Sequence, residues 1–190
     1  MSRKSSRKPI PKPSPSVLIA TKKGAAVGQL ESAILLWFNE ADPISILVLA
    51  SNAHDCFHAL GKKIGKPSWW MTWLESMPPA FKERAKYIQD FAKHGFKDLD
   101  EDAPYEAKVA EMTMIAAVSC YEQIYGPITP LMTLFSARFF FENPNAVLAE
   151  KREHFLKGVS IKGLGDGSRK DFLEKNLHLA AAIRQRLSKM

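Results

Sequence analysis

The chain of 190 residues is 46% hydrophobic and carries 27 lysines and arginines against 20 aspartates and glutamates, a formal net charge of +7. These values are typical of one globular domain with a sizeable core. No segment reaches the ~20 apolar residues of a membrane-spanning helix, which excludes a membrane-embedded protein and predicts a soluble one.

The net positive charge is concentrated in the first 23 residues. They contain no acidic residue, which leaves 20 basic and 20 acidic residues in the rest of the chain. Prolines alternate with polar residues between positions 9 and 15, and this favours extended conformations. The sequence therefore predicts a disordered basic tail over residues 1–23 and a single helical domain over residues 24–190. Either the tail contacts an anionic partner such as nucleic acid, or it only keeps the chain soluble. Its candidate contact residues are Arg3, Lys4, Arg7, Lys8 and Lys12.

Apolar residues recur at spacings of three and four along most of the remaining chain, and no alternating strand pattern of useful length occurs. Glycines, prolines and capping residues divide this pattern into segments. The predicted helices span about residues 24–41, 43–61, 76–95, 104–125, 130–141, 144–157 and 168–187. We therefore expect an all-α protein, a bundle of about six or seven helices.

Four predicted helices have recognisable start signals, and one of these is Asp102-Ala103-Pro104, before the helix over 104–125. Asp42 precedes Pro43 as an N-cap residue precedes a first-turn proline. Ser76 is expected to cap the helix that follows it. Ser168 with Asp171 resembles a capping box at the start of the last helix.

Three of the four tryptophans, Trp69, Trp70 and Trp73, lie within five positions of one another. Such a cluster either lines a ligand pocket or partner surface, or forms a lid packed on the core. The lid is the commoner arrangement, and we expect it here.

The densest cluster of titratable residues is the run D-F-A-K-H-G-F-K-D-L-D-E-D over residues 90–102. His94 falls at a predicted helix end, where the helix dipole favours the protonated imidazole, so it is suited to act as a general acid or to bind an anion with Lys93 and Lys97. With Asp98 and Asp100 nearby, it could instead complete a metal site. Alternatively, the basic side chains only satisfy the last carbonyls of one helix and the acids begin the next. Lys93, His94 and Asp98 are the candidate functional residues.

His54 and His58 stand four residues apart on a predicted helix, which places both imidazoles on one face, as in a two-histidine metal chelate. If His94 packs against that face, the three histidines form a candidate divalent-metal site. The alternative is that these histidines have structural roles. The intervening H-D-C-F-H lacks the H-E-x-x-H motif of metalloproteases.

Two further features favour structural interpretations. Residues 163–170, G-L-G-D-G-S-R-K, precede a helix but lack P-loop spacing, and Asp166 would repel phosphate, so we expect a flexible hinge. Arg138 is expected to stack on aromatic rings, its sequence neighbours being Phe135, Phe139, Phe140 and Phe141.

Two cysteines, Cys56 and Cys120, fall within apolar helical patterns and lack C-x-x-C spacing. Cysteines of this kind are typically reduced core residues. Because disulfides are rare in the cytoplasm, this pattern predicts a cytoplasmic protein.

The stretches A-I-L-L-W-F at 33–38, D-P-I-S-I at 42–46 and F-A-K-H at 91–94 resemble a family of small bacterial all-helical proteins, whose members carry an N-F-x-K-H-A-x-R-D run. The chain matches that run at Phe91, Lys93, His94 and Asp98 and departs from it at Asp90, Gly95 and Lys97. The resemblance covers residues 29–98 and brings no known activity. It implies that Lys93, His94 and Asp98 are the positions to test.

These observations lead to two functional hypotheses. The first is a non-enzymatic, cytoplasmic binding or regulatory module without a cofactor, whose basic tail favours an acidic partner. A protein partner, a second copy of the chain, or nucleic acid bound through the tail all fit this hypothesis. The second is a metal-assisted hydrolase or nuclease that uses His54, His58, His94 and Asp98. The sequence leaves open whether the protein is an enzyme.

Overall fold

The computed structural model describes residues 21–80, 82–83, 87, 106–146, 165 and 167–187, with side chains as far as residue 178. This part of the chain contains helices and turns and no strand, which confirms the predicted all-α class. The helices are α1 (Lys22–Phe38), α2 (Pro43–Lys63), α3 (Trp69–Ser76), α5 (Ala107–Tyr125), α6 (Pro130–Glu142) and α8 (Arg169–Leu187). The candidate residues of the tail, and Lys93, His94 and Asp98, lie outside the described residues.

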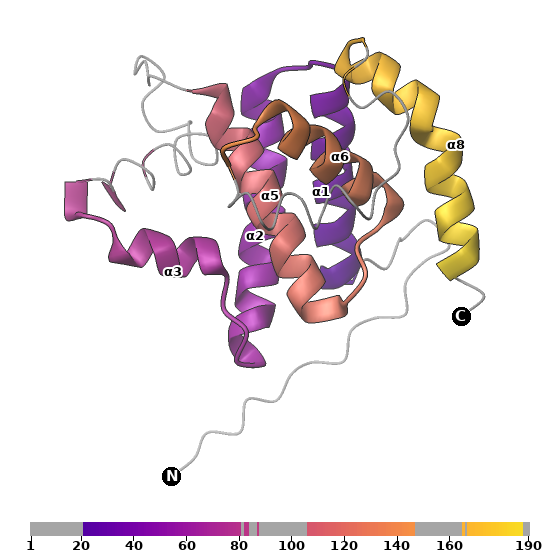
Figure 1. The fold of residues 1–190 in the computed structure, drawn as a ribbon. Coiled ribbons are helices and arrows are strands. Elements are labelled where there is room, and N and C mark those ends of the chain that lie inside the picture. The colour runs from indigo at the N-terminus through magenta and orange to yellow at the C-terminus, as the bar shows by residue number, and fades with distance from the viewer. Residues whose placement is uncertain are drawn as a thin grey trace, which may run out of the picture.

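Helix α2 packs against both α1 and α5, and these three helices run side by side along the bundle (Figure 1). Helices α6 and α8 pack against each other and against α1, while α3 extends away from the bundle. The largest buried side chains are aromatic: Phe38, Phe57, Phe135, Phe139 and Phe172. Burial of such rings contributes most of the apolar stabilisation of a small domain.

Two of the predicted start signals are confirmed. The Asp42 carboxylate accepts hydrogen bonds from the Ser45 N–H at 2.8 Å and the Ile44 N–H at 3.4 Å at the start of α2. At the start of α8, the Ser168 N–H donates to Asp171 at 3.0 Å and the Asp171 N–H donates to the Ser168 hydroxyl at 3.1 Å. Both pairs satisfy backbone donors that a helix start leaves without partners.

The prediction for Ser76 was wrong. Ser76 is the last residue of α3, and its hydroxyl donates to the Trp73 carbonyl at 2.6 Å. The tryptophans form a helix of their own, so Ser76 lies at a helix end, and helical structure resumes only at residue 79.

Other boundaries also differ from the prediction. Helix α1 begins at Lys22, inside the predicted tail, because the Thr21 hydroxyl accepts from the Gly24 N–H at 2.9 Å and caps it. Helix α5 begins at Ala107 rather than at residue 104. Residues 144–146 form a turn instead of a helix start, and the rest of the predicted helix over 144–157 lies outside the described residues.

The turn from α2 to α3 depends on two glycines. A Cβ at Gly61 would lie 2.2 Å from the Lys66 carbonyl oxygen, so the chain can fold back on α2 only where residue 61 has no side chain. Gly65 has a φ of +72°, which L residues rarely adopt. This turn fixes where α3 leaves the bundle.

Candidate functional site

The two histidines predicted on one helix face are both bound by Ser68. Fully buried His54 has its Nε2 2.9 Å from the Ser68 hydroxyl, and the Ser68 backbone N–H donates to His58 Nδ1 at 3.2 Å. The two imidazole rings stack with centroids 6.1 Å apart. Because Ser68 is the N-cap residue of α3, these contacts fasten the start of α3 to α2.

Ser68, His54 and Asp55 are the three residue types of a catalytic triad and lie near one another, but their geometry is not that of a triad. The Ser68 side chain has no exposed surface. Asp55 Oδ1 lies 3.8 Å from His54 Nδ1, which is beyond hydrogen-bonding distance. With a buried hydroxyl and a carboxylate 3.8 Å from the imidazole, this arrangement supports a structural contact rather than a nucleophile.

The pKa values of the two histidines move in opposite directions. Burial alone would lower the pKa of His54, but Asp55 and the Cys120 side chain outweigh it and raise the pKa above 6.5. Burial, with the charges of His54 and Lys62, lowers the pKa of His58 below 6.5. His58 is therefore neutral at pH 7, as its role as an acceptor from Ser68 requires.

The metal hypothesis meets a geometric obstacle at this pair. Ser68 engages His54 Nε2 and His58 Nδ1, so a metal ion bridging these two nitrogens would have to displace it. Among the residues that the structure describes, no group of three or more histidine, cysteine or acidic side chains is placed to hold a metal ion. Because His94 and Asp98 lie outside these residues, the three-histidine site stays a prediction.

The tryptophan cluster is not the expected buried lid. Trp69 and Trp73 are 40% and 38% exposed, and the only buried residue of α3 is Leu74. The Trp70 and Trp73 rings stack with centroids 4.9 Å apart, and the Trp69 and Trp70 rings lie in a T-shaped arrangement. Helix α3 therefore presents two indole rings to the outside, one helical turn apart.

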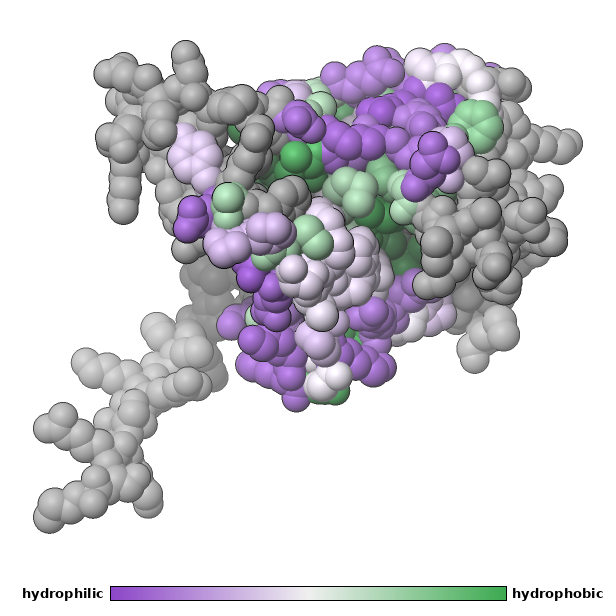
Figure 2. Space-filling model, turned by 60° about the vertical axis from the view of Figure 1, so that its left-hand side comes forward, coloured by the Kyte–Doolittle hydropathy of each residue, from purple (hydrophilic) through white to green (hydrophobic). Residues whose placement is uncertain are grey.

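Lysine side chains from three segments gather at one end of the bundle. Lys22 and Lys23 begin α1, Lys62 and Lys63 end α2, and Lys66 lies in the turn before α3. All five residues are exposed, and we call them the lysine end. Figure 2 shows this end as a hydrophilic lower surface beneath the paler side chains of α3.

Contacts to the end of α5 hold two of these lysines. Lys23 Nζ lies 4.0 Å from the centre of the Tyr125 ring, and Lys66 Nζ donates to the Gln123 carbonyl at 2.9 Å. The opposite end of the bundle, where α1 ends and α2 and α5 begin, carries Glu40, Asp42 and Glu106. Among the described residues, lysines thus predominate at one end of the bundle, which composition alone did not reveal.

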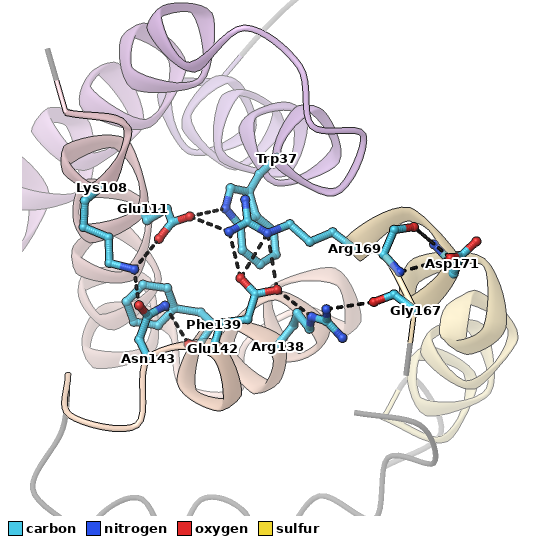
Figure 3. A network of polar contacts seen from close by, with 11 residues as sticks. Trp37, Lys108, Glu111, Arg138, Phe139, Glu142, Asn143, Gly167, Arg169 and Asp171 are labelled. Atoms are coloured by element: carbon cyan, nitrogen blue, oxygen red, sulfur yellow. Dashed lines mark hydrogen bonds and ion pairs between the residues drawn. The ribbon is translucent and has the colours of Figure 1, made fainter. Parts of the chain in front are cut away.

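A network of charged side chains joins α8 to the bundle (Figure 3). The Glu111 carboxylate on α5 accepts from Trp37 Nε1 at 2.9 Å, from Arg169 at 2.7 Å and from Lys108 at 2.7 Å. Arg169 also donates to Glu142 on α6 at 2.7 Å. Burial would raise the pKa of Glu111, but the hydrogen bonds from Lys108 and Trp37 and the charge of Arg169 outweigh it and lower that pKa.

Arg138 belongs to the same network and is buried, as the structural interpretation predicted. Its Nε donates to Glu142 at 2.6 Å, and its Nη2 donates to the Gly167 carbonyl at 3.1 Å. The guanidinium lies 5.9 Å from the Phe141 ring and 5.6 Å from Phe172 on α8. It therefore ties the glycine-rich segment to α6. Residues 163, 164 and 166 of the expected hinge lie outside the described residues.

Comparisons of the chain with protein-family models, with curated proteins and with solved structures gave no match. None of the described helices is both long enough and apolar enough to cross a membrane. The lysine end and the exposed tryptophans of α3 are the candidate functional surfaces of the described residues.

Proposed function

We propose that the protein is a non-enzymatic, cytoplasmic binding module that holds an acidic partner against the lysine end. Five exposed lysines form this surface, and the basic tail joins the bundle at it, since α1 begins at Lys22. The tail residues Arg3, Lys4, Arg7, Lys8 and Lys12 add attraction to the same partner. The free thiols of Cys56 and Cys120 support a cytoplasmic setting.

The observation that carries this proposal is the position of Lys22 and Lys23. Lys62 and Lys63 lie in the last turn of α2, where the helix dipole stabilises positive charge, so their place has a structural explanation. Lys22 and Lys23 lie in the first turn of α1, which contains no acidic residue, and the dipole there disfavours them. The contact of Lys23 with the Tyr125 ring offsets this effect, so Lys22 is the lysine whose position opposes the stability of its own helix, and this supports a role in binding.

Chromatography of the full chain on immobilised heparin, a sulfated polyanion, tests the proposal. We expect the wild type to be retained at low ionic strength and released by salt, because screening weakens contacts between exposed charges. Lys62→Glu with Lys63→Glu should elute at clearly lower salt. Replacing the five tail residues with glutamine should also lower the elution point.

The matched control is Lys170→Glu with Lys175→Glu, two exposed lysines of α8 away from the lysine end. This variant changes the net charge by the same amount, so it should elute close to the wild type. Equal shifts in both charge-reversal variants would contradict a defined binding surface and leave only net charge.

The non-enzymatic part of the proposal has its own test. A rise in Tm on adding Mn²⁺ or Zn²⁺ that is lost in both His54→Ala and His94→Ala would contradict it in favour of the metal-assisted hydrolase. We expect a flat response, because Ser68 engages one ring nitrogen of His54 and one of His58.

A further inference from the structure

The exposed tryptophans lie directly beside the lysine end. Helix α3 begins at Trp69, shortly after Lys66, and the buried contacts of Ser68 with His54 and His58 fasten this start to α2. The two surfaces are therefore continuous and held in one arrangement before any partner arrives. Pre-positioned contact groups lose little conformational freedom on binding.

The aromatic part of this surface consists of two partly exposed indole side chains, and Trp73 stacks one face of its ring on Trp70. Trp69 and Trp73 are four residues apart on α3 and both expose more than a third of their surface, and Ile64 in the preceding turn is 54% exposed. Side chains at this spacing point the same way from a helix. Ring faces next to ammonium groups form the combination on which single-stranded nucleic acids bind, with bases stacking and phosphates paired to cations.

The cations on this surface are all lysines. Of the arginines whose side chains the structure describes, Arg138 and Arg169 are both bound to Glu142 in the charged network. Arginine binds carboxylates and phosphates alike through two parallel bonds, whereas a lysine acts as a compact point charge, so these lysines attract either anion and the choice between them depends on the neighbouring rings. The exposed acids on the adjoining turns, Glu75 and Glu122, are outnumbered by the five lysines.

Resting on the function proposed above, we propose that the acidic partner is a single-stranded nucleic acid, whose phosphates lie along the lysine end and whose bases stack on Trp69 and Trp73. A duplex keeps its bases stacked inside and offers no face to these rings. An acidic peptide supplies charge but no base for them to stack on. The lysines contact the phosphate backbone and the rings contact base faces, which all bases have, so binding has little sequence preference.

Three labelled probes test this with the full chain: an oligothymidine of about 20 nucleotides, a duplex of the same length and poly-glutamate. Fluorescence anisotropy should show the tightest binding for oligothymidine, with quenching of tryptophan fluorescence. Lys62→Glu with Lys63→Glu should reduce the slope of log K against log salt by about 1.4, since each single-strand phosphate contact contributes about 0.7.

Variants at the rings separate stacking from charge. Trp69→Leu with Trp73→Leu should weaken oligothymidine binding by about tenfold or more, and Trp69→Phe with Trp73→Phe should restore most of it because the rings return. Leu177→Ala, at an exposed apolar residue of α8, is the control and should bind as the wild type does. Circular dichroism of each variant verifies that the helices are intact.

The outcomes distinguish this inference from the proposed function. The single-strand inference is overturned, and the acidic-partner function stands, if poly-glutamate or the duplex binds as tightly as oligothymidine. The same holds if Trp69→Leu with Trp73→Leu binds oligothymidine as tightly as the wild type does. If none of the three polyanions binds at low salt, both are overturned.

Discussion

Arg169 and Trp37 bind the same carboxylate oxygen while lying in contact with each other. The guanidinium carbon of Arg169 lies 4.0 Å from the centre of the Trp37 ring, and Glu111 Oε1 accepts from both side chains. Three helices, α1, α5 and α8, are thereby joined through one acceptor. Loss of a charged, mostly buried acceptor strongly destabilises a protein, because the donors that were bound to it are left without partners.

Glu111→Gln should therefore lower the free energy of unfolding by about 2–3 kcal/mol, as expected for hydrogen bonds to a mostly buried charge. Urea unfolding at pH 7 measures this. Glu174→Gln, at an exposed residue of α8, is the control and should change stability by less than about 0.5 kcal/mol. Equal effects in the two variants would show that the network does not hold α8 to the bundle.

The contribution of Glu111 should also depend on pH. Its folded-state pKa lies below the ordinary value of 4.5, because the bonds from Lys108 and Trp37 outweigh burial. A carboxylate with a depressed pKa stabilises the fold above its unfolded-state pKa and loses that effect as the pH falls through the folded-state value. The stability difference between wild type and Glu111→Gln should be constant above about pH 5.5 and shrink below pH 4.5. Unfolding curves across this range measure it, and a difference that grows on acidification contradicts the network.

Alanine substitutions at two helical glycines, Gly61 before the turn to α3 and Gly28 in α1, should change stability in opposite directions. Gly61→Ala should destabilise the protein and move α3, because the new Cβ would lie 2.2 Å from the Lys66 carbonyl oxygen. Gly28→Ala, in the middle of α1 with nothing within 4 Å of its Cβ, should stabilise it by about 0.5–1 kcal/mol. Thermal unfolding gives both values. If Gly61→Ala raises Tm as Gly28→Ala does, the close approach at this turn does not exist.

Lys22→Glu should raise stability and weaken binding at once. An acidic residue in the first turn of α1 interacts favourably with the helix dipole, typically by about 0.3–1 kcal/mol. The same change removes one positive charge from the lysine end and adds a negative one. Urea unfolding and heparin elution of the same preparation measure the two effects. If the variant is more stable but elutes at the wild-type salt concentration, Lys22 does not belong to the binding surface.

The helical class, most helix bounds and two helix caps followed from local patterns in the sequence. Asp42 with Pro43, and Ser168 with Asp171, act within a few residues of chain, so their signals were readable. The prediction for Ser76 failed because it placed this serine at the start of the following helix. The tryptophans before it form a helix of their own, α3, and Ser76 is its last residue. The candidate residues Lys93, His94 and Asp98 lie outside the part of the chain that the structure describes.

The site depended on tertiary relationships that no local pattern contains. The bond between Trp37 and Glu111 joins residues far apart in sequence, and a lone glutamate in an apolar helix gave only a weak signal. The lysine end could more easily have been predicted from the sequence. Because α1 and α2 are joined by a short connection, the first turn of one and the last turn of the other must meet, which brings Lys22 and Lys23 to Lys62 and Lys63.

Lysine footprinting of the full chain tests the central claim most directly. An amine-reactive reagent is applied with and without saturating oligothymidine, and the modified residues are quantified by mass spectrometry. The account predicts protection of Lys22, Lys23, Lys62, Lys63 and Lys66, with Lys170 and Lys175 on α8 unchanged. Protection of the α8 lysines to the same degree, or none at the lysine end while the oligonucleotide is bound, would contradict it.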